Sequence, residues 1–294
     1  MTTATAEPQT RTLEAPGATL AYDIRPVAGT TEPVLFLIGS PMGAAGFVTL
    51  AGHFPDRSIA TYDPRGSERS VKADPTSQST PDQHADDLHL IIQALGGGPV
   101  DLFASSGGAV NALALVAKHP EDVRLLIAHE PPLAAILPDR VGALGAAQAI
   151  SETYQRSGWG AGMAHFIAVV SHKGPFPDDY GEQPGPDPAM FGMPAVDDGS
   201  RTDVMLAQNI ITCTHYEPDF DALRAASTHI VVAVGEESEG EMARRGGEAV
   251  AERLGITPEI FPDGHGGFLG GEYGQIGKPD EFSAKLREVL RSAG

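Results

Sequence analysis

Short apolar segments alternate with segments of helical periodicity through the first 130 residues of the chain. Near-continuous apolar strands separated by helices are typical of a parallel sheet that is covered on both faces. The pattern therefore predicts an α/β fold. The segments that we expect as strands are 18–24, 33–38, 57–62, 100–104 and 123–129, and those that we expect as helices are 81–95 and 108–119.

The alternation stops after Pro131 and resumes at His229. The intervening stretch contains helical segments and a loop rich in Pro, Gly and Asp over 174–200. The simplest architecture is a core in two blocks, 1–132 and 226–294, with a mostly helical cap of residues 133–225 inserted between them. The second block is expected to contain strands at 229–234 and 258–261 and helices at 240–254 and 281–291.

A serine lies at the turn between a predicted strand and a predicted helix, in Ala104-Ser105-Ser106-Gly107-Gly108. A serine exposed on such a sharp turn needs small residues two positions before and after it, as in the pattern Gly-x-Ser-x-Gly. Ser106 has Ala104 and Gly108 at these positions, whereas Ser105 would have the bulky Phe103. We therefore predict Ser106 as a nucleophile at the N-terminus of a helix, where free N–H groups favour developing negative charge.

A serine hydroxyl needs a base to remove its proton, and histidine has a suitable pKa. Of the ten histidines, only His265 lies in a loop after the last predicted strand and before the closing helix. His129 also lies at a strand end, where it could line the site. We predict His265 as the base.

The carboxylate that would orient this base has two possible locations. Glu130 ends the strand that follows the nucleophile helix, and two prolines come directly after it. Glu236 and Glu237 follow the next predicted strand, but the residue three positions after Gly235, where an Asp commonly lies, is Ser238. This substitution favours Glu130 and leaves Glu236 and Glu237 as alternatives.

An oxyanion formed from the substrate would need hydrogen-bond donors that point at it to stabilise its charge. The backbone N–H of Gly107 is one candidate, and the loop after residues 33–38 should supply a second. Pro41 has no N–H, so Ser40 is the predicted second donor. Apolar and aromatic residues near the predicted site and in the cap are candidates for substrate contact: Met42, His129, Trp159, Met163, Phe166 and Phe191.

Together these motifs resemble the α/β-hydrolase superfamily, from the strand Pro33-Val-Leu-Phe-Leu-Ile-Gly through Asp63-Pro-Arg-Gly-Ser and the serine turn to His265. The resemblance implies an α/β-hydrolase fold, with a mostly parallel central sheet flanked by helices and a helical cap. The sequence departs from the superfamily pattern at Ala104 and at Ile38, which stands where His-Gly is common.

A narrower resemblance concerns the acid. In some haloalkane dehalogenases and in zearalenone-type lactonases, a glutamate ends the strand after the nucleophile helix, and Glu130 follows Ser106 by 24 residues. The lactonases also have a Ser-Ser-Gly turn and a His-Glu-x-Pro segment, similar to Ser105-Ser106-Gly107 and to His129-Glu130-Pro131-Pro132. Dehalogenases and epoxide hydrolases of this fold use an aspartate nucleophile, which Ser106 is not. The resemblance implies hydrolysis of a carboxylic ester or a lactone through a Ser-His-Glu triad.

Other functions remain open at this point. The same triad supports acyl transfer, hydrolysis of a carbon–carbon bond and cofactor-free peroxidation, and a hydrolase fold can also serve as a non-catalytic ligand-binding protein. The sequence alone does not choose the substrate, and it leaves a homodimer open.

The composition narrows the classes of partner. The formal net charge of −19 disfavours nucleic acid and anionic membrane surfaces. The single cysteine, Cys213, excludes an intramolecular disulfide and a multi-cysteine metal site. We expect no metal and no organic cofactor. The N-terminus does not resemble a secretory signal, and no stretch approaches the roughly 20 apolar residues of a membrane helix. A cytoplasmic protein acting on a small molecule is expected.

Overall fold

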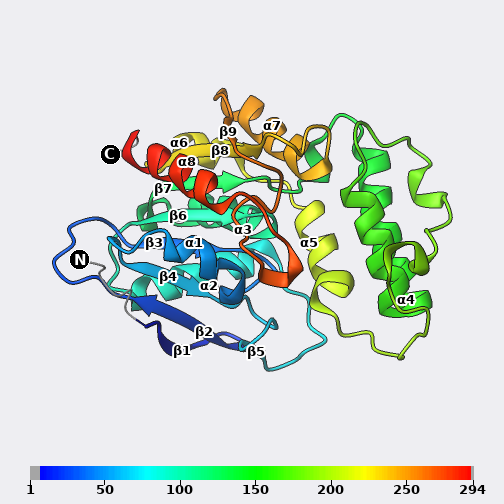
Figure 1. Ribbon diagram of the computed structural model, residues 1–294, viewed down its shortest axis with the longest axis horizontal. Coiled ribbons are helices and arrows are strands. Elements are labelled where there is room, and N and C mark those ends of the chain that lie inside the picture. Colours follow the sequence, from blue (N-terminus) through cyan, green and yellow to red (C-terminus); the bar gives the residue numbers. More distant parts are fainter. Residues whose placement is uncertain (1–6, 293–294) are drawn as a thin grey trace.

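The computed structural model describes residues 7–292 and contains a central nine-stranded sheet (Figure 1). The strand order is β1-β2-β4-β3-β6-β7-β8-β9, and β5 pairs with β2. β2 pairs antiparallel with β1, β4 and β5. The neighbouring strands β4, β3, β6, β7, β8 and β9 pair parallel to one another, in that order. The strands are β1 (Gln9–Ala15), β2 (Ala18–Arg25), β3 (Leu35–Ile38), β4 (Ile59–Tyr62), β5 (Val71–Lys72), β6 (Val100–Ser105), β7 (Val123–His129), β8 (His229–Gly235) and β9 (Glu259–Phe261).

Helices cover both faces of this sheet. One apolar cluster packs α1 and α8 against one face, and a second packs α2, α3, α6 and α7 against the other. Because both faces are covered, β3, β4 and β6 are buried along their whole length, as their continuous apolar sequences predict. The α-helices are α1 (Val48–Gly52), α2 (Pro81–Ala94), α3 (Gly107–Lys118), α4 (Arg140–Val170), α5 (Ile210–Thr214), α6 (Phe220–Ala225), α7 (Met242–Leu254) and α8 (Pro279–Ser292).

The observed sheet confirms the expected α/β-hydrolase fold, with small differences at the N-terminus. The sequence does not predict β1 or β5. β1 pairs with β2 at the edge of the sheet, and its side chains are largely exposed. A strand without a buried face lacks the apolar alternation by which strands are recognised.

The expected cap segment contains α4, several short helical turns and α5. In Figure 1, α4 lies apart from the sheet and α5 lies between α4 and the sheet. The backbone of α4 is interrupted at Gly158, which has a φ of 83° and a ψ of −177°. Apolar residues of α4, of α5 and of the π-helical turn η6 (Met205–Asn209) form a third cluster, which also includes Met242 of α7. Leu223 of α6 already belongs to the sheet cluster, so the chain returns to the core before residue 225.

Among residues 7–292, no helix combines the length and the apolar character that a membrane span requires.

Candidate active site

Ser106 occupies a strained turn between β6 and α3. Its φ of 59° and ψ of −128° are rare for a residue with a side chain, and such conformations persist where the surrounding structure enforces them. The backbone N–H of Ser106 donates to the carbonyl of His129 on the neighbouring strand, at 2.9 Å. The turn therefore lifts the Ser106 side chain above the C-terminal edge of the sheet, at the N-terminus of α3.

The small residues around Ser106 are required by close backbone contacts. A Cβ atom at Gly108 would lie 2.7 Å from the Cα of Gly39, and one at Gly107 would lie 2.5 Å from the carbonyl oxygen of Ser40. The loop after β3 therefore packs directly onto the first turn of α3. This contact explains why the residue two positions after Ser106 is glycine.

Replacing Gly108 with alanine should destabilise the protein by about 2 kcal/mol, because the added methyl group meets backbone atoms that cannot rotate away. Urea unfolding followed by circular dichroism would measure the change. Gly52→Ala is the matched control, since a Cβ there meets nothing within 4 Å and should leave stability nearly unchanged. Equal stability of the two variants would contradict the close packing of the loop on α3.

Glu130 and His265 form a close pair beside this turn. The His265 Nδ1 lies 2.7 Å from Glu130 Oε2, and Glu130 is fully buried whereas the His265 side chain is 39% exposed. Glu130 follows β7 with a φ of 48°, and its backbone N–H donates to Ala233 on β8. With Nδ1 held by the carboxylate, Nε2 is the ring nitrogen left to accept a proton.

The second oxygen of Glu130 is held by two donors that the sequence did not identify as functional. The backbone N–H of Gly235 donates to Glu130 Oε1 at 2.7 Å, and the Ser238 hydroxyl donates to the same oxygen. Ser238, at the position where an Asp commonly lies in the superfamily that the sequence resembles, is thus a hydrogen-bond partner of Glu130. The side chains of Glu236 and Glu237 are exposed, and Glu237 pairs with Lys278 instead.

The environment fixes the charges of this pair. Burial alone would raise the pKa of Glu130, but the hydrogen bond from His265, the nearby histidines and the Ser238 hydroxyl lower it to about 2. Burial lowers the pKa of His265, and the hydrogen bond and charge of Glu130 outweigh this effect, so its pKa is raised above the ordinary value. The imidazole is therefore a stronger base than a free histidine.

Replacing Ser238 with alanine should lower the free energy of unfolding by about 2 kcal/mol, because a buried carboxylate loses one of its three donors. Urea unfolding at neutral pH would measure this loss, and Ser238→Thr, which keeps a hydroxyl, serves as the control. An alanine variant as stable as the wild type would contradict a role for Ser238 in holding Glu130.

A cavity of about 320 Å³ is lined both by Ser106 and His265 and by residues of the expected cap segment. Ser106, Gly107, Ser40 and His265 all line it, together with apolar residues of α4 and α5. Within the described chain, the Ser106 hydroxyl and the imidazole share this cavity without a direct hydrogen bond. Such contacts commonly tighten only when substrate binds.

The predicted oxyanion residues lie where the loop after β3 meets α3. Ser40 is buried, and its hydroxyl accepts a hydrogen bond from Asn209 Nδ2 at 2.8 Å. Asn209 is the last residue of the π-helical turn η6, a type of turn that is frequent at functional sites. Asn209 was missed at the sequence level because its contact with Ser40 spans 169 positions.

The structure places only one of the six predicted substrate-contact residues on the cavity wall, namely Phe166. His129 is fully buried behind the site, where its Nδ1 lies 3.0 Å from the Ser105 hydroxyl and its ring stacks on His265. Burial lowers the pKa of His129 to about 4, so this ring is neutral at physiological pH. The His129 side chain points away from the cavity and packs against the rings of Phe103 and Phe282.

The other four predicted contact residues also lie away from the cavity lining. Met42 packs against the apolar cluster under α1 and α8. Trp159 packs in the cluster around α4 and donates to Asp203 Oδ2 at 3.2 Å. Met163 on α4 and Phe191, at the end of a short turn (Pro188–Phe191), are half-buried outside the wall. Met42 and Trp159 are thus occupied in packing against other protein side chains.

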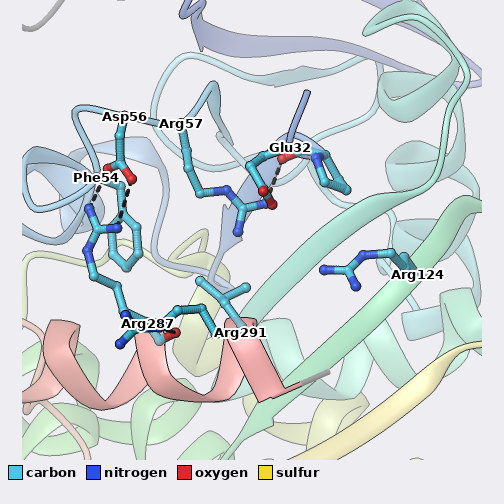
Figure 2. A pocket seen from close by; sticks show the side chains of 9 residues that line it. Glu32, Phe54, Asp56, Arg57, Arg124, Arg287 and Arg291 are labelled. Carbon is cyan, nitrogen blue, oxygen red and sulfur yellow. Dashed lines mark hydrogen bonds and ion pairs between the residues drawn. The ribbon is translucent and has the colours of Figure 1, made fainter. Parts of the chain in front are cut away.

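A larger cavity, of about 550 Å³, lies away from these residues and near the amino-terminal ends of β3 and β7 (Figure 2). Arginines surround it, and acidic residues already pair with several of them. Arg57 and Arg124 both bind Asp101, and Arg287 binds Asp56. Neither Ser106 nor His265 lines this cavity. This cavity is therefore separate from the candidate active site.

Three potential metal ligands, His89, His119 and Asp122, lie together beside α2 and α3, with ligand atoms within 4.8 Å of one another. The two imidazoles are stacked, with centroids 4.0 Å apart and planes inclined by 15°. Stacked rings cannot direct their in-plane lone pairs at one ion without turning. His89 Nδ1 is also only 2.6 Å from Asp122 Oδ2, which is a hydrogen-bond distance. This arrangement is a hydrogen-bonded cluster rather than a preformed metal site.

Comparisons with known proteins agree with this architecture. A family model described as alpha/beta hydrolase fold matches residues 32–154. The uncharacterized hydrolase YraK of Bacillus subtilis (strain 168) is 35% identical over 127 residues, which are 43% of this chain and 46% of that protein. The chain thus matches less than half the length of this relative.

Two solved structures resemble nearly the whole chain. A thermophilic esterase from Thermogutta terrifontis is 21% identical, with a TM-score of 0.64 and coverage of 98% of this chain and 99% of the esterase. A proline iminopeptidase from Mycobacterium smegmatis is 17% identical, also with a TM-score of 0.64, and the coverage is 97% and 98%. Equal similarity to an esterase and a peptidase concerns the fold and does not choose a reaction. On sheet order, serine turn and these comparisons together, the chain has the alpha/beta hydrolase fold.

Proposed function

We propose that this protein is a serine hydrolase that cleaves a carboxylic ester or a lactone through an acyl-enzyme intermediate. The observation that carries the proposal is the placement of Ser106 and His265 on one cavity, with His265 Nδ1 held by the buried Glu130. A nucleophile, a base and an orienting carboxylate in this relation are the parts that acyl transfer to serine requires.

In the proposed mechanism, the Ser106 hydroxyl attacks the carbonyl carbon while His265 Nε2 takes its proton. Glu130 stabilises the imidazolium and keeps the proton on Nδ1. The backbone N–H groups of Gly107 and Ser40 donate to the oxyanion, and each such donor contributes on the order of 3 kcal/mol. The imidazolium then protonates the leaving alcohol, and a water molecule activated by the same histidine releases the acyl group.

The choice of an ester or a lactone rests on the position of the acid. Glu130 lies at the end of β7, as the glutamate does in the zearalenone-type lactonases that the sequence resembles, and Ser238 occupies the alternative location. The cavity wall is mainly apolar, with Phe166, Val169 and Ile210 among its residues, which suits an organic ester or lactone of modest size.

A panel of aryl esters, alkyl esters and lactones, with product analysis by mass spectrometry, tests this function. We expect wild-type protein to release carboxylic acid from an ester or a lactone and to accumulate an acyl group on Ser106 in the first turnover. If an added alcohol or amine captured the acyl group in preference to water, acyl transfer would replace hydrolysis as the activity. Absence of both turnover and acylation across the panel would overturn the proposal.

A further inference from the structure

Glu241 brings a carboxylate to the wall of the reactive cavity, and the proposed mechanism makes no use of it. It lies between β8 and α7 and lines the cavity together with Ser106 and His265. Among the described residues that line this cavity, Glu241 is the one carboxylate, and none is a Lys or an Arg. The wall of the cavity therefore carries negative charge.

The contacts of Glu241 leave its carboxylate largely unpaired. Its backbone N–H donates to Ser238 at 3.0 Å and its carbonyl accepts from Arg245, so the backbone is fixed. The side chain makes no capping hydrogen bond to α7. Its closest cation is Lys173 Nζ at 4.0 Å, and the Lys173 side chain is 58% exposed. An ion pair that is this long and this exposed to water contributes little to stability.

The surroundings make an isolated charge at Glu241 costly. The side chain is only 24% exposed, and burial together with the nearby Glu130 carboxylate raises the pKa of Glu241. A cation bound in the cavity would offset this cost, whereas a bound carboxylate would add to it. Glu130 cannot provide this recognition itself, because it is fully buried and all its partners are protein groups.

We propose that Glu241 forms a subsite for a positively charged amine or ammonium group of the substrate. The preferred substrates would then be esters that carry a cationic nitrogen, and neutral or anionic analogues would react more slowly. The inference builds on the proposed hydrolase function, since it concerns the same cavity. It also predicts that the cavity binds cationic ligands that the protein does not hydrolyse.

Matched substrates that differ only in charge test the subsite. On the acyl side, the pair is the p-nitrophenyl ester of 3-aminopropanoate and that of butyrate. On the alcohol side, the pair is butyrylcholine and its carbon analogue 3,3-dimethylbutyl butyrate. We expect wild-type kcat/KM to favour the cationic member of at least one pair by about tenfold, after correction for uncatalysed hydrolysis. A charge-assisted hydrogen bond or ion pair supports a difference of this size.

The variant Glu241→Gln keeps the size of the side chain and removes its charge. We expect it to bring the ratio of kcat/KM for the cationic member to kcat/KM for the neutral member close to one. Glu252→Gln, which removes an exposed carboxylate from α7, the helix that follows Glu241, is the control and should retain the wild-type preference. The subsite would be overturned if the wild type showed equal kcat/KM for the two members of each pair. It would also be overturned if the preference for the cationic member persisted in Glu241→Gln.

A binding measurement separates this inference from the proposed hydrolysis. Calorimetric titration with 3-aminopropanamide and with butyramide should show tighter binding of the cation to wild type, and no such difference in Glu241→Gln. If this difference appeared in a protein that hydrolysed none of the esters, the hydrolase function would fail while the subsite stood. If esters were hydrolysed without any charge preference in rate or binding, the subsite would fail while the hydrolase function stood.

Discussion

The variant Ser106→Ala should lose all covalent labelling by a fluorophosphonate probe and at least about 10⁴-fold in kcat. The strained turn presents the Ser106 hydroxyl to the cavity that His265 also lines, and this hydroxyl is the proposed nucleophile. Binding of substrate should persist, because the cavity wall is unchanged. Peptide mass spectrometry of the labelled protein would locate the probe, and an ester assay would measure the rate.

The matched control is Ser105→Ala, which removes the adjacent hydroxyl. Ser105 is buried and its Oγ is engaged with His129, away from the cavity. Its loss should therefore leave labelling of Ser106 intact. Label on Ser105, or on no serine at all, would contradict the assignment of the nucleophile and the mechanism that follows from it.

The sequence contained enough information to predict the sheet and the serine turn. Buried parallel strands are apolar throughout, and the turn demands small residues on both sides of Ser106, so both leave a local pattern. The choice of Glu130 over Glu236 and Glu237 was open, and it depended on Ser238 occupying the usual position of an Asp. In the structure, Glu130 is the carboxylate that contacts His265, and Ser238 contacts Glu130.

The cavity wall could not be predicted in this way. Asn209 and Glu241 reach the site from segments far apart in the sequence, and neither belongs to a recognisable motif. Conversely, Trp159 and Met42 look like ligand contacts because they are large and apolar, yet they pack into protein clusters. Local patterns reveal which residues the backbone turn requires, whereas cavity contacts depend on how the inserted helices pack.

The variant Glu130→Gln should lower kcat by about 10⁴-fold through the tautomer of His265. Gly235 N–H and the Ser238 hydroxyl both donate to one oxygen of Glu130, so the amide oxygen of glutamine will take that place. The amide NH₂ group then faces His265 Nδ1, which must accept and leave its proton on Nε2. A protonated Nε2 cannot receive the proton of Ser106.

The controls for this variant are Glu236→Gln and Glu237→Gln, which remove the two alternative carboxylates. Both side chains are exposed, and neither contacts His265, so each control should retain nearly full activity. A loss of activity in either control as large as that in Glu130→Gln would transfer the role of the acid to the exposed pair.

The wild type and the Glu130→Gln variant should also differ in how their stability depends on pH in acid. The folded pKa of Glu130, at about 2, lies below its unfolded value, so its ionised form stabilises the fold. This contribution, on the order of 3 kcal/mol, is fully present above about pH 5 and is lost as the pH falls toward 2. In Glu130→Gln the same range should show a smaller loss of stability, which urea unfolding at several pH values would measure. An identical acid dependence in the two proteins would mean that Glu130 is not held as a buried carboxylate. The proposal that the Glu130 carboxylate orients His265 would then be contradicted as well. Both the stabilisation of the fold and the orientation of His265 depend on the same hydrogen bonds of Glu130.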